Sequence, residues 1–300
     1  MVVSDGGQIN SSTLGQGAAG NITITASDSV ELLRSPEGII IQTGIFPTST
    51  IGEGKAGDLV LDTSRLIIQD GAGIASASGG IIGQTILSRN GGQTGNLTIT
   101  TTESIEISGV SEPLADGNRI PSFISNQTST KSDSGNITID TNKLIVKDGG
   151  LISAATLDAG DAGNITINAL ESVEVSGAVL DGEFSSTIEA SSGRAFSIED
   201  ANATGNAGNL FINTGNLLIS DGGLMSASTF GEGIGGNINL NASESIEIVG
   251  TGFDDLEQNF VLGIISGTLD LSTPGTGLFT GSSGSASSGA INIETTSLRL

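Results

Sequence analysis

The sequence has 300 residues, of which 46 are glycine, and it contains neither cysteine nor histidine. Its 33 acidic and 10 basic residues give a formal net charge of -23. Such a charge repels polyanions, so we expect no nucleic acid among its partners. The missing residue types exclude disulfides, thiolate or imidazole metal sites, cysteine nucleophiles and Ser–His triads.

After a short opening segment, the chain repeats a unit that begins with Gly-Asn-Ile or a close variant. These units begin at Gly20, Gly57, Gly95, Gly135, Gly163, Gly208, Gly236 and Gly289. Two forms alternate. Form one, which starts with the first unit, continues with an acidic residue, Ser, Val or Ile, Glu and an aliphatic residue. Form two runs into an Asp-Gly turn such as Asp70-Gly71 and then a strand of small residues. This repeat predicts one elongated domain over residues 1–300.

Within each unit the side chains alternate as they do in strands. In residues 165–167 two isoleucines flank Thr166, and in residues 173–175 two valines flank Glu174. A third short strand follows, for example at residues 152–153. Each unit has too few aliphatic residues to bury itself alone, so neighbouring units must share a core.

These patterns predict an all-β fold, a right-handed parallel β-helix (β-solenoid) of about seven to eight turns with three short strands each. Each unit would make one turn, and its strands would pair with the next turn about 4.8 Å along the axis. We expect loops to be concentrated on alternate turns.

An asparagine follows the opening glycine in most units. It stands at Asn21, Asn96, Asn136, Asn164, Asn209 and Asn237, with Asp58 and Ala290 as exceptions. Stacked asparagines can form a hydrogen-bonded ladder, and asparagine tolerates the left-handed backbone that a corner can require. The alternative interpretation is a polar binding stripe.

Acidic residues recur in the form-one units only. They are Glu31, Glu106, Glu174 and Glu247, with Asp28, Glu103, Glu171 and Glu244 nearby. Like charges on alternate turns would stand about 10 Å apart, near one Debye length, where repulsion is tolerable. We interpret the column as a solvated face. A row of calcium ions is the alternative, because carboxylates suit calcium, but the nonapeptide of calcium-bound β-rolls is absent.

The form-one units also contain most of the insertions. These longer segments hold Pro36, Pro47, Pro113, Pro121 and Pro274, and Phe46, Phe123, Phe184, Phe196, Phe253, Phe260 and Phe279. If the insertions leave from one corner of successive form-one turns, they build one loop-covered face. Alternatively, each phenylalanine fills a small core beneath its own loop.

Both ends of the sequence read as cuts within a repeat. Residues 3–7 match residues 219–223, and residues 296–300 match residues 63–67. Residues 1–5 do not resemble a signal peptide, and no apolar run reaches the roughly 20 residues of a membrane span; the longest is residues 260–265. Because cut ends expose unpaired strands, we expect end-to-end self-association of the isolated segment.

The alternating units resemble the repeats of filamentous-haemagglutinin-like exoproteins, particularly the very large ones of cyanobacteria. The resemblance rests on units such as residues 163–177 and 148–154, and it covers essentially the whole chain. It implies a shaft in a secreted or surface-attached adhesin, exported by an outer-membrane transporter of the two-partner type. Cell-surface or matrix glycans are the implied adhesion partners. The secretion domain of that family is not recognisable in this sequence.

The sequence therefore favours a non-catalytic structural role, without catalytic, cofactor or metal-binding residues. The alternative is a polysaccharide lyase or hydrolase on the same scaffold, which needs clustered acids and a base on adjacent turns. Here the basic residues are scattered: Lys143 and Lys147 flank one strand, and Arg119 and Arg194 lie in loops.

A third hypothesis is ice or surface binding by a flat threonine face. Thr23 and Thr25, and again the pair at residues 98 and 100, suggest it. The corresponding pairs elsewhere interrupt the array: Val60/Asp62, Thr138/Asp140, Phe211/Asn213 and Asn239/Asn241.

Overall fold

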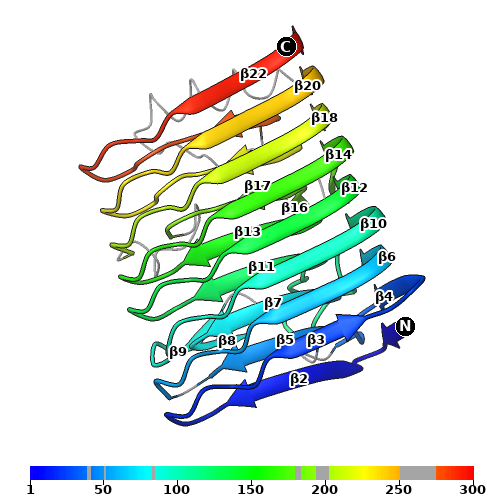
Figure 1. Ribbon diagram of the computed structural model, residues 1–300. Coiled ribbons are helices and arrows are strands. Elements are labelled where there is room, and N and C mark those ends of the chain that lie inside the picture. Colours follow the sequence, from blue (N-terminus) through cyan, green and yellow to red (C-terminus); the bar gives the residue numbers. More distant parts are fainter. Residues whose placement is uncertain (39–41, 51, 83–84, 180–183, 194–202, 251–274) are drawn as a thin grey trace.

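The computed structural model describes residues 1–300 except 39–41, 51, 83–84, 180–183, 194–202 and 251–274. In the described part of the chain, every regular element is a strand. The strands stack in sequence order into a rod, with the two termini at opposite ends (Figure 1). The prediction of an all-β parallel solenoid is confirmed.

Two parallel sheets form the rod. The long sheet has 10 strands: β1 (Val2–Ser4), β3 (Ile22–Thr25), β4 (Ser29–Leu33), β6 (Leu59–Gln69), β10 (Leu97–Ser108), β12 (Ile137–Lys147), β14 (Ile165–Ser176), β18 (Leu210–Ser220), β20 (Ile238–Val249) and β22 (Ile291–Arg299). The short sheet has 8: β2 (Gln8–Thr13), β5 (Gly44–Ser49), β7 (Gly73–Ser78), β11 (Phe123–Thr128), β13 (Leu151–Thr156), β17 (Thr187–Glu189), β19 (Leu224–Ser226) and β21 (Gly277–Phe279). Two antiparallel hairpins belong to neither sheet: β8 (Gly80–Ile82) with β9 (Thr85–Ser88), and β15 (Ala178–Val179) with β16 (Phe184–Ser185).

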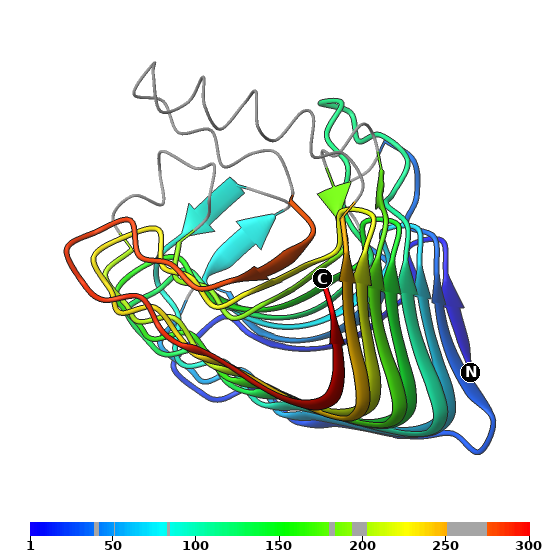
Figure 2. The ribbon, with the colours of Figure 1, turned by 90° about the horizontal axis from the view of Figure 1, so that it is seen from above.

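Each turn is one long-sheet strand followed by one short-sheet strand. Seen along the axis, the long sheet bends to form two sides of a triangle and the short sheet forms the third (Figure 2). Of the 8 short-sheet strands, all but β2 follow a complete long-sheet segment, which gives seven full turns. Part turns lie at both ends, so the predicted number of turns is confirmed.

The three short strands expected in each turn are not separate elements. In most turns the first two merge into one bent strand, as in β14, because hydrogen bonding continues through the bend. The interior is narrow there, and small side chains occupy it. They include Ala26, Thr63, Thr101, Thr141, Ala169, Thr214 and Ala242. The prediction is corrected to one bent strand and one short strand per turn.

A β-bulge at the bend separates the two forms of the unit. The form-two strand β12 has 11 residues and the form-one strand β14 has 12. Thr141 pairs with Ala169 and Lys143 pairs with Ser172, so one residue of β12 faces two of β14. The extra residue bulges outward and leaves Leu170 exposed. Each form-one bend therefore presents an additional side chain to solvent.

The core consists of aliphatic columns that run along the rod. In the long sheet Ile139, Ile167 and Ile212 follow one another, and in the short sheet Ile152 precedes Ile188. All five side chains are buried. Each buried side chain contributes roughly 1.5–3 kcal/mol, and no single turn could obtain this burial without its neighbours.

The form-one insertions leave from one corner, where the long sheet passes into the short sheet. Form-two turns close this corner with a tight link in the left-handed region, as at Asp148 (φ 52) and Gly149 (φ 85). In form-one turns the insertions lie between β4 and β5, β10 and β11, β14 and β17, and β20 and β21. The prediction of one shared corner is confirmed.

One insertion departs from the predicted alternation. The β8–β9 hairpin belongs to a form-two turn and follows β7, at the opposite end of the short sheet. An insertion there starts after β7 has completed its pairing, so it leaves the long sheet undisturbed. The insertions are thus concentrated on the form-one turns, as predicted, and this hairpin is an exception to the alternation.

Candidate binding surface on the long sheet

The asparagine column forms a continuous hydrogen-bonded ladder along the corner that precedes the long sheet. Each side-chain Oδ1 accepts a hydrogen bond from the backbone N–H of the equivalent residue one turn further along, at 2.8 to 3.0 Å. The ladder runs through Asn21, Asp58, Asn96, Asn136, Asn164, Asn209, Asn237 and Ala290. The predicted ladder is confirmed, and it argues against a free polar binding stripe at this corner.

This geometry explains the two exceptions in the column. Asp58 supplies the same acceptor oxygen as asparagine, and Ala290 only needs to donate its backbone N–H. Left-handed backbone is not the reason for asparagine here, because among the described residues those with positive φ, apart from glycine, are four aspartates and Arg34, and none of them lies in this column. What the column requires is an oxygen acceptor.

From Gly57 onward, the glycine before each ladder residue is required by close backbone approach. A Cβ on Gly163 would lie 1.9 Å from the carbonyl oxygen of Gly135, and one on Gly208 would lie equally close to that of Gly163. No heavy atoms approach so closely, so this corner excludes a side chain.

The acidic residues are partly neutralised by bases from the form-two turns. At the bulge, Arg65 lies 2.8 Å from Asp28, and Lys143 lies 2.8 Å from Glu171. Further along the same strands, after the bulge, Lys147 lies 3.1 Å from Glu106. Two of the basic residues that looked scattered in the sequence, Lys143 and Lys147, are therefore aligned with the acids by the alternation of the two forms.

The pKa of Lys147 is raised above its ordinary value, chiefly by its hydrogen bond to Glu106. The nearby negative charges of Glu106, Asp148 and Glu174 act in the same direction, and partial burial opposes them. The lysine is thus held in its charged, paired form. Lys147 is therefore not free to act as a general base.

Hydroxyl side chains at the ends of the insertions tie form-one turns to the preceding Asp-Gly turns. Thr43, Ser122, Ser186 and Thr276 each stand directly before a short-sheet strand and accept a hydrogen bond from the glycine N–H of that turn. Ser122 also donates to the carbonyl of Ser108 at 2.7 Å. The sequence contains this signal, a Ser or Thr before each form-one short strand. It is visible only when the form-one units are aligned with their insertions left out.

The phenylalanines on the short-sheet strands of the first two form-one turns are structural. Phe46 and Phe123 are each 7% exposed and form a satellite cluster with Leu114 and Ile120 over the outer face of the short sheet. Gly73 leaves room for the Phe123 ring, which lies within 2.5 Å of where a Cβ would stand. The cluster joins rings from two form-one turns, so it is shared and not one core per loop. Phe196, Phe253, Phe260, Pro274, Arg194 and residues 260–265 lie outside the described residues.

The part of the long sheet before the bend is its first arm. The outer face of this arm is formed by two columns of side chains that are in register from turn to turn. The first contains Thr23, Val60, Thr98, Thr138, Thr166, Phe211, Asn239 and Asn292. The second contains Thr25, Asp62, Thr100, Asp140, Asn168, Asn213, Asn241 and Glu294. The predicted alignment of these pairs is confirmed. Threonine dominates early and amides dominate late, so the face is no uniform threonine array.

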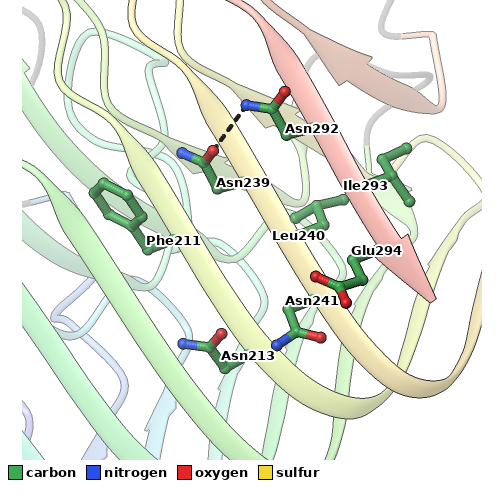
Figure 3. A pocket seen from close by; sticks show the side chains of 8 residues that line it. All are labelled: Phe211, Asn213, Asn239, Leu240, Asn241, Asn292, Ile293 and Glu294. Carbon is green, nitrogen blue, oxygen red and sulfur yellow. Dashed lines mark hydrogen bonds between the residues drawn. The ribbon is translucent and has the colours of Figure 1, made fainter.

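Phe211 marks the change from threonine to amide, and its ring is 38% exposed. An open depression of about 330 Å³ lies beside it, lined by residues of β18, β20 and β22. Figure 3 shows the ring in one row with Asn239 and Asn292, and Asn213 and Asn241 in the row next to it. The ring and the amides thus face the same open surface.

The amides around Phe211 are only partly used inside the protein. Asn213 donates to Asn168 at 2.9 Å, and Asn292 donates to Asn239 at 2.9 Å (Figure 3). Within the described residues, no hydrogen bond occupies the Oδ1 of Asn213 or the side chain of Asn241. A carboxamide offers two donors and two acceptor lone pairs, so much of this capacity remains open to a ligand.

Other site types find little support in the described residues. No group of three or more acidic side chains in that part of the chain could hold a metal ion. None of its elements is a helix that is long and apolar enough to cross a membrane.

Comparison with known proteins identifies no relative. No protein-family model matches the chain, and neither a curated protein nor a solved structure gives a significant match.

Proposed function

We propose that this chain is part of the non-catalytic shaft of a secreted or surface-attached adhesin. The observation that carries the proposal is the corner ladder, which continues from Asn21 to Ala290 and fixes each turn to the next. A rod whose length grows by identical steps is suited to holding a contact surface away from the cell. The resemblance of the repeats extends the proposal in two ways. The protein would be exported by an outer-membrane transporter of the two-partner type, and it would contact cell-surface or matrix polysaccharides.

The ion pairs support a structural role over a catalytic one. Lys143 and Lys147, the bases nearest to the acidic columns of the central turns, are each paired with a carboxylate. A lyase would need a base free to take a proton from its substrate.

The test is incubation of the purified chain with soluble cell-surface and matrix polysaccharides, recording retention and polysaccharide chain length together. The proposal expects unchanged chain length, whether or not a polysaccharide is retained. Shortening of any polysaccharide would contradict it and favour an enzyme on the β-helix scaffold.

A further inference from the structure

We propose that Phe211 and the amides beside it form a binding site for an extended, neutral polysaccharide on the outer face of the long sheet, which the described insertions leave bare. This inference rests on the proposed adhesive function and moves the contact surface from the insertions to the shaft. The site comprises Phe211, Asn213, Asn239 and Asn241, all on β18 and β20.

The first argument is the exposure of the aromatic ring. Phe46 and Phe123 are buried in the satellite cluster. Phe211, by contrast, occupies a position of the threonine column on the outer face of a strand, where it is exposed to solvent. Neither core packing nor an insertion accounts for a large apolar ring at this position. Exposed aromatic rings beside polar groups are characteristic of binding surfaces, because one flat face can pack against a ligand while hydrogen bonds orient it.

The second argument is the arrangement of the amides. Asn213 and Asn241 follow one another in one column, and Asn239 follows Phe211 in the other. Successive turns repeat these groups every 4.8 Å or so along the axis, comparable to the length of one sugar residue in an extended chain. A polysaccharide lying along the rod could stack one ring on Phe211 and place hydroxyls of the next residue against Asn239 and Asn241.

The third argument is charge. The depression beside Phe211 is lined by four amides, three apolar residues and one carboxylate, Glu294, with no basic residue. The chain as a whole carries a net charge of -23. Uronic-acid and sulfated polysaccharides would be repelled, and hydroxyl groups of a neutral chain match the donors and acceptors of the amides.

The experiment measures binding of the whole chain to four neutral polysaccharides, a mixed-linkage glucan, xylan, galactomannan and soluble chitin oligomers, with polygalacturonate and chitosan as charged probes. The variants are Phe211→Ala and Asn241→Ala. Phe279→Ala is the matched aromatic control, since its ring is 45% exposed but lies on the short sheet. Thr138→Ala is the control within the same column. Circular dichroism and melting temperature show whether each variant folds.

We expect at least one neutral polysaccharide to be retained, with little dependence on salt. Phe211→Ala should weaken retention about tenfold or more and Asn241→Ala several-fold, while both controls bind like the wild type. Equal retention by folded Phe211→Ala, loss of binding in Phe279→Ala instead, or retention of chitosan alone would overturn the inference. So would failure of all four neutral polysaccharides to bind, which leaves the shaft proposal standing. Shortening of a polysaccharide would overturn the shaft proposal itself.

Discussion

The outer faces of the long and short sheets differ although both belong to the same turns. The long sheet presents bare columns whose register continues from turn to turn, whereas the short sheet is covered by insertions and by the cluster around Phe46 and Phe123. Figure 2 shows the hairpin β8–β9 and residues 109–122 gathered on the side of the short sheet. The outer sides of both arms of the long sheet are free of them.

The difference shows where a solenoid tolerates variation. The corner before the long sheet is closed by the glycine approach and the Oδ1 ladder, which accept few substitutions. The corner before the short sheet is closed by a local Asp-Gly link that an insertion can replace, provided that a hydroxyl such as Ser122 restores the hydrogen bond. Substitutions at five positions test this contrast.

Gly163→Ala should have the largest effect, because its Cβ would collide with the backbone of the preceding turn at the corner before the long sheet. We expect the free energy of unfolding to fall by at least about 3 kcal/mol, measured by chemical denaturation. Gly17→Ala is the control, since a Cβ there meets nothing within 4 Å. Similar losses in both variants would show that the close approach is not what selects glycine.

Phe123→Ala probes the covered face. Removing this ring empties the satellite cluster, and we expect a loss of about 2–3 kcal/mol in the free energy of unfolding. The exposed ring of Phe279, on the same sheet, should cost less than about 0.5 kcal/mol when it is replaced by alanine. A negligible effect of Phe123→Ala would mean that the insertions are not held by a core of their own.

Ser122→Ala tests the joint between the two regions. It leaves the N–H of Gly71 without its buried partner and removes one hydrogen bond from the carbonyl of Ser108, which still accepts the backbone N–H of Asp70, so we expect a loss of about 1–2 kcal/mol. Ser125→Ala, on the next strand, removes a hydroxyl without a comparable role and should be nearly neutral. Equal stability of the two variants would refute the capping role of Ser122.

Asn136→Ala and Asn136→Asp separate the acceptor from the amide in the ladder. The alanine removes the acceptor for the N–H of Asn164 and should cost about 1 kcal/mol. The aspartate keeps that oxygen, as Asp58 does naturally, and should remain within about 0.5 kcal/mol of the wild type. If aspartate is as damaging as alanine, the amide–amide contacts carry the ladder instead.

Lys147→Met should have the smallest effect, below about 1 kcal/mol, because the ion pair with Glu106 is partly exposed. The folded-state pKa of Lys147 lies above its ordinary value of 10.5. Its contribution is therefore complete below pH 10.5 and disappears as the pH rises through the raised pKa. Unfolding measured across this window should show the wild type and Lys147→Met converging. Parallel curves for Lys147→Met would contradict the pairing.

Periodic features of the molecule could be predicted from the sequence. The two-residue alternation around Thr166 indicated the inward columns, and the recurrence of the Gly-Asn pairs indicated the ladder and the number of turns. The alignment of Phe211 with Thr138 and Asn239 followed from the same register.

Features that depend on three-dimensional neighbours could not be predicted. The bend that merges two strands lies where the pairing register shifts between Ala169 and Ser172, and the pairing of Arg65 with Asp28 depends on the bulge. Phe211 read only as an interruption of a threonine array. Its ring became a candidate for binding once the structure placed it on the face that the described insertions leave bare.

The central claim concerns the two corners of the rod. The corner before the long sheet is fixed from turn to turn by the Oδ1 ladder, whereas the corner before the short sheet carries the insertions. Amide hydrogen exchange, resolved by residue, tests it most directly at the N–H groups of Asn96, Asn136, Asn164, Asn209 and Asn237. These groups lie at an exposed corner, yet each is bonded to the preceding turn. We predict exchange as slow as that of the buried strand residues and far slower than that of residues 115–118 in the insertion after β10. Exchange at the rate of that insertion would contradict the account, because the ladder would then not couple the turns in solution.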